Sequence, residues 1–508
     1  MSFVIEPYVL KTTTTSAQIV WVMPEGTDAG SVQIEKQAGG GLQEIDAEVT
    51  TPEFVNDPGT AQILYHVRQV AYIDFLEPYT RYNYTINAGD GETVSTGSFI
   101  TMRESSDNGP VSFVISADGH GGTGGGTTGY DDTVPFISAL NPDFVAHLGD
   151  FVGGSGEFYR WPGFFRESQP YLSISSLIDA KGGHDHGSTS RNYESLFTHN
   201  DPNGPPVTGN NPVYYSVRHG NVEIFIYDYT ADTATQHAWL EQVVPASDAR
   251  WKILGTHGQV NNPAGGLGST FESPVIAQLC IDLGIDVAVQ GHWHVIEETV
   301  PIGAPGVKPV FFYTINPAEK SRSTRPSPIS IVNATRWSFL HIAVDGDTMT
   351  LTHRKRDHNE YWNQTIVTKD EFGMYQEEIM NQAIGLDTAI QIAHIWTGNS
   401  FAVATVRRGN REDIHCKLAE MPTEGQPVVI EFDTGARRNN GGWPIGSKLI
   451  IEEQNDPVGW QSTYQELEVT GETTQGVIIA PSSFTYDEEG GFDPQLELQV
   501  NFELPEEE

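Results

Sequence analysis

Positive charge is the scarcest property of this chain. Lysine and arginine together number 28 of 508 residues, against 67 aspartates and glutamates, which gives a formal net charge of −39 at pH 7. A chain so acidic repels nucleic acid backbones and anionic membrane surfaces, so we expect no general affinity for nucleic acid. It also repels anionic substrates, and a phosphate site would need local cations to reverse the field.

Cysteine and long apolar runs are lacking as well. The two cysteines, Cys280 and Cys416, lie far apart in the sequence, and we expect a buried thiol at Cys280 rather than a disulfide. No run of about 20 apolar residues occurs, so we expect no membrane span. The first 21 residues lack the basic segment and the long apolar core of a signal peptide. The compartment stays open: the protein remains inside, leaves by another route, or has lost a leader.

Glycine and proline, by contrast, are plentiful at 52 and 30 residues, which is typical of a turn-rich protein with β-strands. The length favours about three domains. Residues 1–104 contain short β-branched and aromatic segments between Gly, Pro and Asp clusters, and this pattern predicts a small β-sandwich. Within it, residues 71–91 resemble a corner of fibronectin type III domains, where a Leu-x-Pro turn precedes a tyrosine-rich strand.

The pattern changes after a polar linker at 103–110. Residues 111–118 form an apolar run that ends in an acid, as a buried strand does. Further runs of this kind alternate with helical patterns, at 143–150, 221–230, 251–258 and 286–294 for the strands and at 131–140, 237–248 and 274–284 for the helices. The alternation predicts an α/β domain over 110–356, a layered β-sandwich flanked by helices. A hairpin built on Asp345-Gly346 closes it.

The last third of the chain carries less information. Residues 357–390 are interpreted as a linker that contains a helix over 369–384. Residues 391–508 return to β-strand patterns, which predicts a separate β-rich C-terminal domain with an acidic tail, and this segment contains no motif that indicates its role.

Acids and histidines gather where the strands of the α/β domain end. Each cluster alone is a weak signal, but five in one order form a strong one. They are Asp118-Gly119-His120, Gly149-Asp150, Gly183-His184-Asp185, Thr256-His257 and Gly291-His292-Trp293-His294. Carboxylates and imidazoles together suit first-row metals such as Mn, Fe, Zn or Co. Two ions that share a carboxylate clamp the attacking and leaving oxygens of an in-line phosphoryl transfer.

This order of motifs resembles the calcineurin-like metallophosphoesterase superfamily, whose pattern is D-x-H, G-D, G-N-H-D/E, H and G-H-x-H. A fibronectin-like domain in front of it is similar to purple acid phosphatases and alkaline phosphatases of the D type. The resemblance implies a metal-dependent hydrolase of phosphomonoesters or phosphodiesters. In that family a hydroxide that bridges two divalent or trivalent ions (Mn, Fe, Zn or Co) attacks phosphorus in line. The implied partner is a small-molecule phosphoester.

The resemblance also assigns roles to residues. It implies that three residues hold the first ion, that Asp150 bridges, and that two histidines hold the second ion. The first set is Asp118, His120 and His294, and the second is His257 and His292. His184 falls on the catalytic histidine that protonates the leaving group, held by Asp185. Arg191 is a candidate for substrate contact.

Two positions depart from the family pattern. Gly183 stands where the family has a metal-binding asparagine, so the second ion should bind more weakly, take an extra water, or use a nearby group such as His186. Gly153 stands where purple acid phosphatases have a tyrosine ligand, so we expect no tyrosinate-to-iron colour.

An alternative reading remains open. Gly183 and the flanking β domains also fit a structural or adhesive protein, for example virion- or surface-associated, with a degenerate metallophosphoesterase core. The family resemblance suggests an extracytoplasmic location, and the cytoplasm or a virion stays an alternative. The oligomeric state is open.

Overall fold

The computed structural model describes residues 2–383 with gaps, and beyond them six strands. The gaps are 58–61, 122–129, 155–156, 186–191, 198–212, 232, 259, 261–273, 304–306, 317–329, 335–336, 356–360, 377–378 and 381–382.

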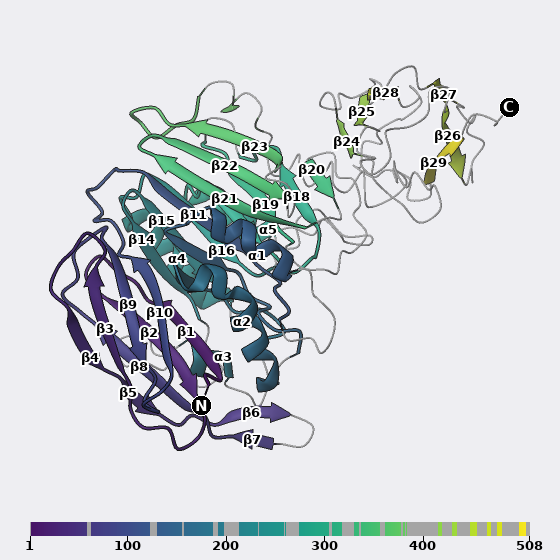
Figure 1. Ribbon diagram of the computed structural model, residues 1–508. Helices are drawn as coiled ribbons and strands as arrows, with labels where there is room; N and C mark the ends of the chain where they lie inside the picture. The colour runs from purple at the N-terminus through teal and green to yellow at the C-terminus, as the bar shows by residue number, and fades with distance from the viewer. Residues whose placement is uncertain are drawn as a thin grey trace.

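Two β-sheets face each other in the region predicted to be an α/β domain (Figure 1). One contains β11 Val111–Ser116, β12 Phe144–His147, β13 Ser176–Asp179, β21 Ser338–Asp345, β22 Thr348–Lys355 and β23 Tyr361–Thr368. The other contains β14 Tyr215–His219, β15 Val222–Tyr227, β16 Trp251–Thr256, β17 Val287–Gln290, β18 Ile296–Thr299, β19 Phe311–Thr314 and β20 Ser330–Ala334. Side chains from both sheets, such as Phe113 and Ile253, share one buried cluster. The predicted layered α/β fold and its closing hairpin, β21 with β22, are confirmed.

Helices cover the outer face of the first sheet. They are α1 Tyr130–Ala139 and α2 Trp161–Leu172, which the 3₁₀ turn Phe158–Arg160 precedes. Tyr130 and Phe164 from these helices pack with Val114 and Val145 from the sheet. Because β11 and β12 are thus buried on both faces, they read as continuous apolar runs.

Three further helices belong to the connections. α3 Asn192–Leu196 follows β13, while α4 Thr233–Ala246 and α5 Pro274–Asp282 join successive parallel strands of the second sheet. Cys280 on α5 is a buried free thiol, as expected.

The N-terminal segment is a β domain of two sheets. One face contains β1 Ile5–Leu10, β2 Ala17–Met23, β8 Val67–Ile73 and β5 Glu48–Thr50, and the other contains β3 Ser31–Lys36, β4 Gln43–Asp46, β9 Arg81–Asn87 and β10 Val94–Ile100. Trp21, Ile34 and Tyr84 are in the core between them. A small hairpin, β6 Phe54–Asp57 with β7 Gln62–Leu64, forms a separate two-stranded sheet. The resemblance to fibronectin type III domains and the boundary at 104 stay predictions.

One sheet runs across that boundary. Strand β1 pairs in parallel with β13, with Val9 opposite Ser176 and Leu10 opposite Leu177, so ten strands form a single sheet. Tyr8 on β1 is fully buried, and its hydroxyl donates a hydrogen bond to the Leu196 carbonyl of α3 at 2.7 Å. The N-terminal strands therefore support the strand and helix on either side of the 183–185 motif.

The helix predicted over 369–384 is wrong for residues 369–375. Lys369 and Tyr375 form a β-bridge, and the Asp370 carboxylate accepts hydrogen bonds from the backbone N–H groups of Phe372 and Met374, both at 2.9 Å. Gly373 has φ +82°, which a helix does not allow. An aspartate that closes a turn and a left-handed glycine override the helical pattern.

The C-terminal segment contains two three-stranded antiparallel sheets, which agrees with the predicted β-rich character. They are β24 His415–Leu418, β25 Val429–Asp433 and β28 Gln475–Ile479, and β27 Gln465–Glu468, β26 Lys448–Gln454 and β29 Glu497–Glu503.

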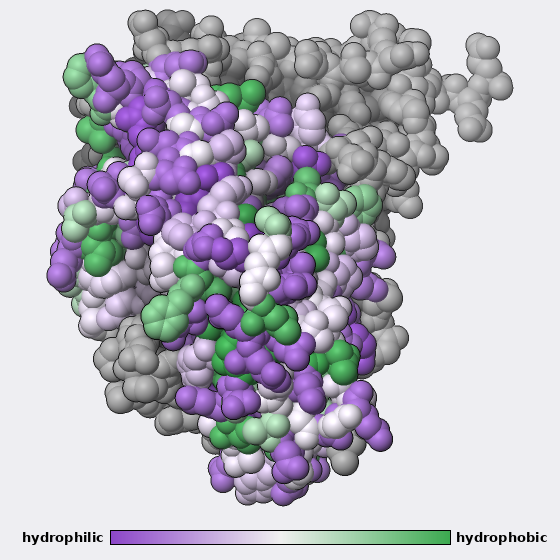
Figure 2. All heavy atoms as spheres, turned by 60° about the vertical axis from the view of Figure 1, so that its left-hand side comes forward, coloured by the Kyte–Doolittle hydropathy of each residue, from purple (hydrophilic) through white to green (hydrophobic). Residues whose placement is uncertain are grey.

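The surface shown in Figure 2 is mainly hydrophilic, and its apolar residues lie in separate patches. Scattered apolar residues of this kind are ordinary on protein surfaces. Among the described residues, no helix has the length and hydropathy needed to cross a bilayer.

The contact of Tyr8 generates a stability prediction. Tyr8→Phe should lower the free energy of unfolding by about 1 kcal/mol, because only one hydrogen bond is lost. Tyr8→Ala should lower it by ~3–5 kcal/mol, because the ring that packs on Phe165 at 4.3 Å between centroids is lost too. Denaturant unfolding measures both, and equal effects would contradict the packing role.

Candidate metal centre

The predicted site residues follow parallel strands of both sheets. Strands β11, β12 and β13 are parallel to one another in the first sheet, as are β15, β16 and β17 in the second. Asp118 follows β11, Asp150 follows β12, His257 follows β16 and His292 follows β17. Since parallel strands end at the same sheet edge, the fold brings these loops together.

Six of these residues form two groups with the spacing of metal ligands. One group is Asp118, His120, Asp150 and His294, and the other is Asp150, His257 and His292. Within each group the candidate ligand atoms lie within 4.8 Å of one another, and both groups contain Asp150. This division is the one that the family resemblance implies for two ions with a bridging carboxylate.

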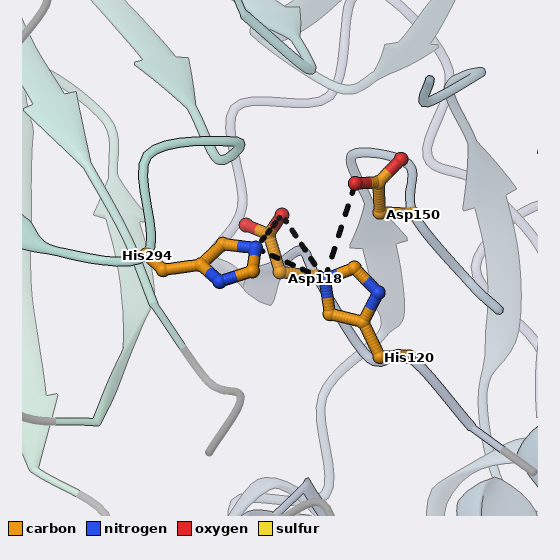
Figure 3. Close-up of side chains that lie close together, drawn as sticks. All are labelled: Asp118, His120, Asp150 and His294. Atoms are coloured by element: carbon orange, nitrogen blue, oxygen red, sulfur yellow. Dashed lines mark hydrogen bonds and ion pairs between the residues drawn. The ribbon is translucent and has the colours of Figure 1, made fainter. Parts of the chain in front are cut away.

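The first group is compact (Figure 3). The Nε2 atoms of His120 and His294 are 3.0 Å apart, and His294 Nε2 is 3.4 Å from Asp118 Oδ1. His120 Nε2 is also 3.9 Å from Asp150 Oδ2. Figure 3 shows both imidazoles and both carboxylates directed toward one space.

The backbone at the site is strained. Nine described residues other than glycine have positive φ, and five of them are candidate ligands. They are Asp118 (50°), His120 (45°), Asp150 (52°), His292 (70°) and His294 (54°). Such conformations cost about 1–3 kcal/mol each and collect at functional sites, where the surrounding structure enforces them.

Hydrogen bonds orient the candidate ligand side chains. His257 Nδ1 lies 2.7 Å from the Leu148 carbonyl, so Nδ1 carries the proton and Nε2 faces the site. That Nε2 atom is buried without a hydrogen-bond partner, 3.2 Å from Asp150 Oδ2. The His292 backbone N–H donates to Asp118 Oδ2 at 2.9 Å. An imidazole nitrogen and a carboxylate oxygen buried side by side can hold a cation once the imidazole is neutral, and nitrogen with oxygen donors suits first-row metals.

Charges within the site support ionised carboxylates. Burial lowers the pKa of His257, but Asp150 and Asp118 outweigh it and raise that pKa to about 9. Burial lowers the pKa of His120 to about 4. Burial raises the pKa of Asp150, yet the charges of neighbouring histidines hold it well below its usual range. The Asp150 carboxylate is therefore anionic at neutral pH and attracts cations.

His184 lies at the edge of this centre. Its side chain is 52% exposed, and its Nε2 is 3.9 Å from Asp150 Oδ2. Its ring meets the ring of His120 edge-on, with centroids 5.2 Å apart. The backbone N–H of His184 donates to Asp150 Oδ1 at 2.8 Å, which fixes the distance of His184 from the shared carboxylate.

Asp185 has a different role from the one predicted. Its carboxylate is buried and accepts hydrogen bonds from the backbone N–H groups of Asp150, Phe151 and Gly182, at 2.8, 2.9 and 2.9 Å. Burial, and then the charge of Asp150, raise its pKa to about 8. The carboxylate thus fastens the loop of Asp150 and does not hold His184, because backbone donors of that loop surround both of its oxygens.

Sequence reasoning missed Tyr229. A Cβ atom at Gly183 would lie 2.4 Å from the Tyr229 hydroxyl oxygen, so this side chain reaches the position of the missing asparagine. The available signal was its place two residues beyond β15, at the same sheet edge as the other motifs. Arg191 and His186 lie outside the described residues.

The loop contact of Asp185 generates a test. Asp185→Ala removes the acceptor for four backbone donors, the fourth being Val152, so the loop of Asp150 should loosen and metal affinity should fall roughly 10- to 100-fold. Metal analysis by mass spectrometry after gel filtration measures this. His184→Ala is the matched control and should keep its metal. An Asp185→Ala protein with normal metal content but no turnover would restore the original role of orienting His184.

Comparisons with known proteins agree with this fold. Residues 111–296 match the family model of the calcineurin-like phosphoesterases. The fold is similar to purple acid phosphatase PPD1 from yellow lupin (Lupinus luteus) seeds, with TM-score 0.62 and 17% identity over 72% of this chain and 74% of that one. It is also similar to PhoD, with TM-score 0.54 and 12% identity over 72% of this chain and 89% of that one. No curated protein sequence matches significantly. Residues 111–296 are thus a domain of the calcineurin-like phosphoesterase family.

Proposed function

We propose that this protein hydrolyses small-molecule phosphoesters, monoesters or diesters, at a centre that holds two metal ions. The observation that carries the proposal is the pair of ligand groups that share Asp150. Asp118, His120 and His294 would hold one ion, and His257 and His292 the other. Bound ions would supply positive charge to the phosphoryl oxygens and would activate water as the nucleophile.

Charge makes the ions necessary. The chain carries a formal net charge of −39, and two of its carboxylates, Asp118 and Asp150, are buried in the site. Without cations, a phosphoester dianion or monoanion would be repelled from this site. Two bound ions would neutralise the carboxylates and would leave surplus positive charge for the substrate, which supports a role of the metals in binding as well as in chemistry.

His184 is the proposed proton donor. Its imidazole is half exposed at the edge of the centre, so it can reach the leaving oxygen of a bound ester. A positioned acid in this place stabilises the developing alkoxide by transferring a proton to it. The hydrogen bond from its backbone N–H to Asp150 holds the backbone of His184 beside the centre.

The alternative is a structural or adhesive protein with a degenerate core. In a protein without catalytic activity, strained residues at the ligand positions would cost folding free energy without any functional benefit, because each positive-φ residue is unfavourable. All six candidate ligands remain in two compact groups here. Their retention favours the enzyme.

Two variants test the function. Asp150→Asn should lose metal and turnover together, because both groups lose a charged ligand. His184→Ala should keep its metal and lose roughly 100- to 10,000-fold in turnover. Metal content is measured beside cleavage of p-nitrophenyl phosphate and bis-p-nitrophenyl phosphate.

His237→Ala is the control, since His237 lies on α4 outside both groups and should retain full activity. A wild-type protein that holds two ions yet cleaves neither ester under Mn, Zn, Fe or Co loading would contradict the proposal. A fully active His184→Ala variant would contradict the role of that histidine.

A further inference from the structure

Gly183 leaves the second ligand group one side chain short of the family pattern. That group offers Asp150, His257 and His292. The backbone at position 183 is beside the shared carboxylate, because the next residue, His184, donates its N–H to Asp150 Oδ1 at 2.8 Å. A ligand that replaced the asparagine would therefore have to reach this space from another strand.

Tyr229 reaches it. The Cβ that Gly183 lacks would lie 2.4 Å from the Tyr229 hydroxyl oxygen and 3.7 Å from its Cζ. The hydroxyl thus occupies the volume that a side chain at 183 would fill. No alanine or asparagine fits there unless the phenol moves, so Gly183 and Tyr229 form a matched pair.

The phenol ring also lies against both histidines of the second group. Its centroid is 5.1 Å from that of His257 and 5.6 Å from that of His292, and the two imidazoles are 5.2 Å apart. Tyr229 is half-buried and lies two residues beyond the end of β15. Three rings therefore lie together beside Asp150, whose Oδ2 is 3.2 Å from His257 Nε2.

We propose that the Tyr229 phenol oxygen is the ligand that replaces the side chain missing at Gly183, and that the second site takes ferric iron. The proposal rests on the two-metal centre of the proposed function. The donor set becomes two imidazoles, one carboxylate and one phenolate. Phenolate is a hard anionic oxygen, which suits a hard trivalent ion better than a soft one. Binding releases the phenol proton to solvent, as ligand deprotonation requires.

Colour reports this ligand independently of activity. A phenolate bound to ferric iron absorbs visible light by charge transfer, whereas imidazole and carboxylate ligands alone do not. Gly153 stands where the purple acid phosphatase tyrosine is expected, which predicted a colourless protein. Tyr229 reverses that expectation.

The test loads the full-length protein with ferric citrate and records iron per chain and the visible spectrum. The wild type should bind two irons and be coloured. Tyr229→Phe keeps the ring and removes only the oxygen, so it should lose the visible band and bind the second iron at least tenfold more weakly. Tyr227→Phe is the matched control. Its hydroxyl meets His237 at 3.4 Å, outside both groups, and its spectrum should be unchanged.

A reciprocal pair of variants tests the matched positions. Gly183→Asn alone should lose the second iron, because its side chain collides with the phenol. Gly183→Asn combined with Tyr229→Ala should regain the second iron without colour, since asparagine then supplies the oxygen. If the double variant binds one iron while the wild type binds two, the exchange of ligands is wrong.

The outcomes separate the two proposals. A wild type with two colourless irons, or a Tyr229→Phe protein that keeps its band and both irons, overturns the assignment of Tyr229 alone. In that case the hydroxyl only packs against Gly183. A wild type that binds no iron, manganese, zinc or cobalt at either group contradicts the two-metal centre itself, and the Tyr229 assignment with it.

Discussion

The carboxylate of Asp150 is the element on which the rest of the site depends. One oxygen accepts the His184 N–H at 2.8 Å, and the other is 3.2 Å from His257 Nε2. Both ligand groups contain this residue, so its position sets the distance between them. Two features of the fold hold Asp150 in place. It follows strand β12, and the Asp185 carboxylate accepts hydrogen bonds from the backbone N–H groups of Asp150 and Phe151.

The excess negative charge of the chain is consistent with a centre of buried carboxylates and imidazoles that can hold cations. An acidic chain that is to handle a phosphoester needs cations, and buried carboxylates with neighbouring imidazoles provide a place to hold them. The cost is strain, since five candidate ligands have positive φ. The wider fold opposes that strain: two packed sheets meet at the site, and the N-terminal strand β1 extends one of them.

The sequence could indicate the six residues that the structure gathers in two groups, because their motifs follow apolar runs and the ends of parallel strands converge whatever the loops contain. It does not predict the partner of Asp185, since that depends on where backbone N–H groups of a distant loop point. Tyr229 was missed because it belongs to no motif and lies beside Gly183 only in the folded structure. The prediction of a helix over 369–375 was wrong because Asp370 and Gly373 form a turn, which the spacing of apolar residues does not reveal.

The central claim is that two ions share Asp150. Anomalous diffraction from crystals of the metal-loaded protein tests it most directly. The account predicts two anomalous peaks about 3.5–4 Å apart, both within bonding distance of the Asp150 carboxylate. A single peak, or two peaks of which only one contacts Asp150, would contradict it.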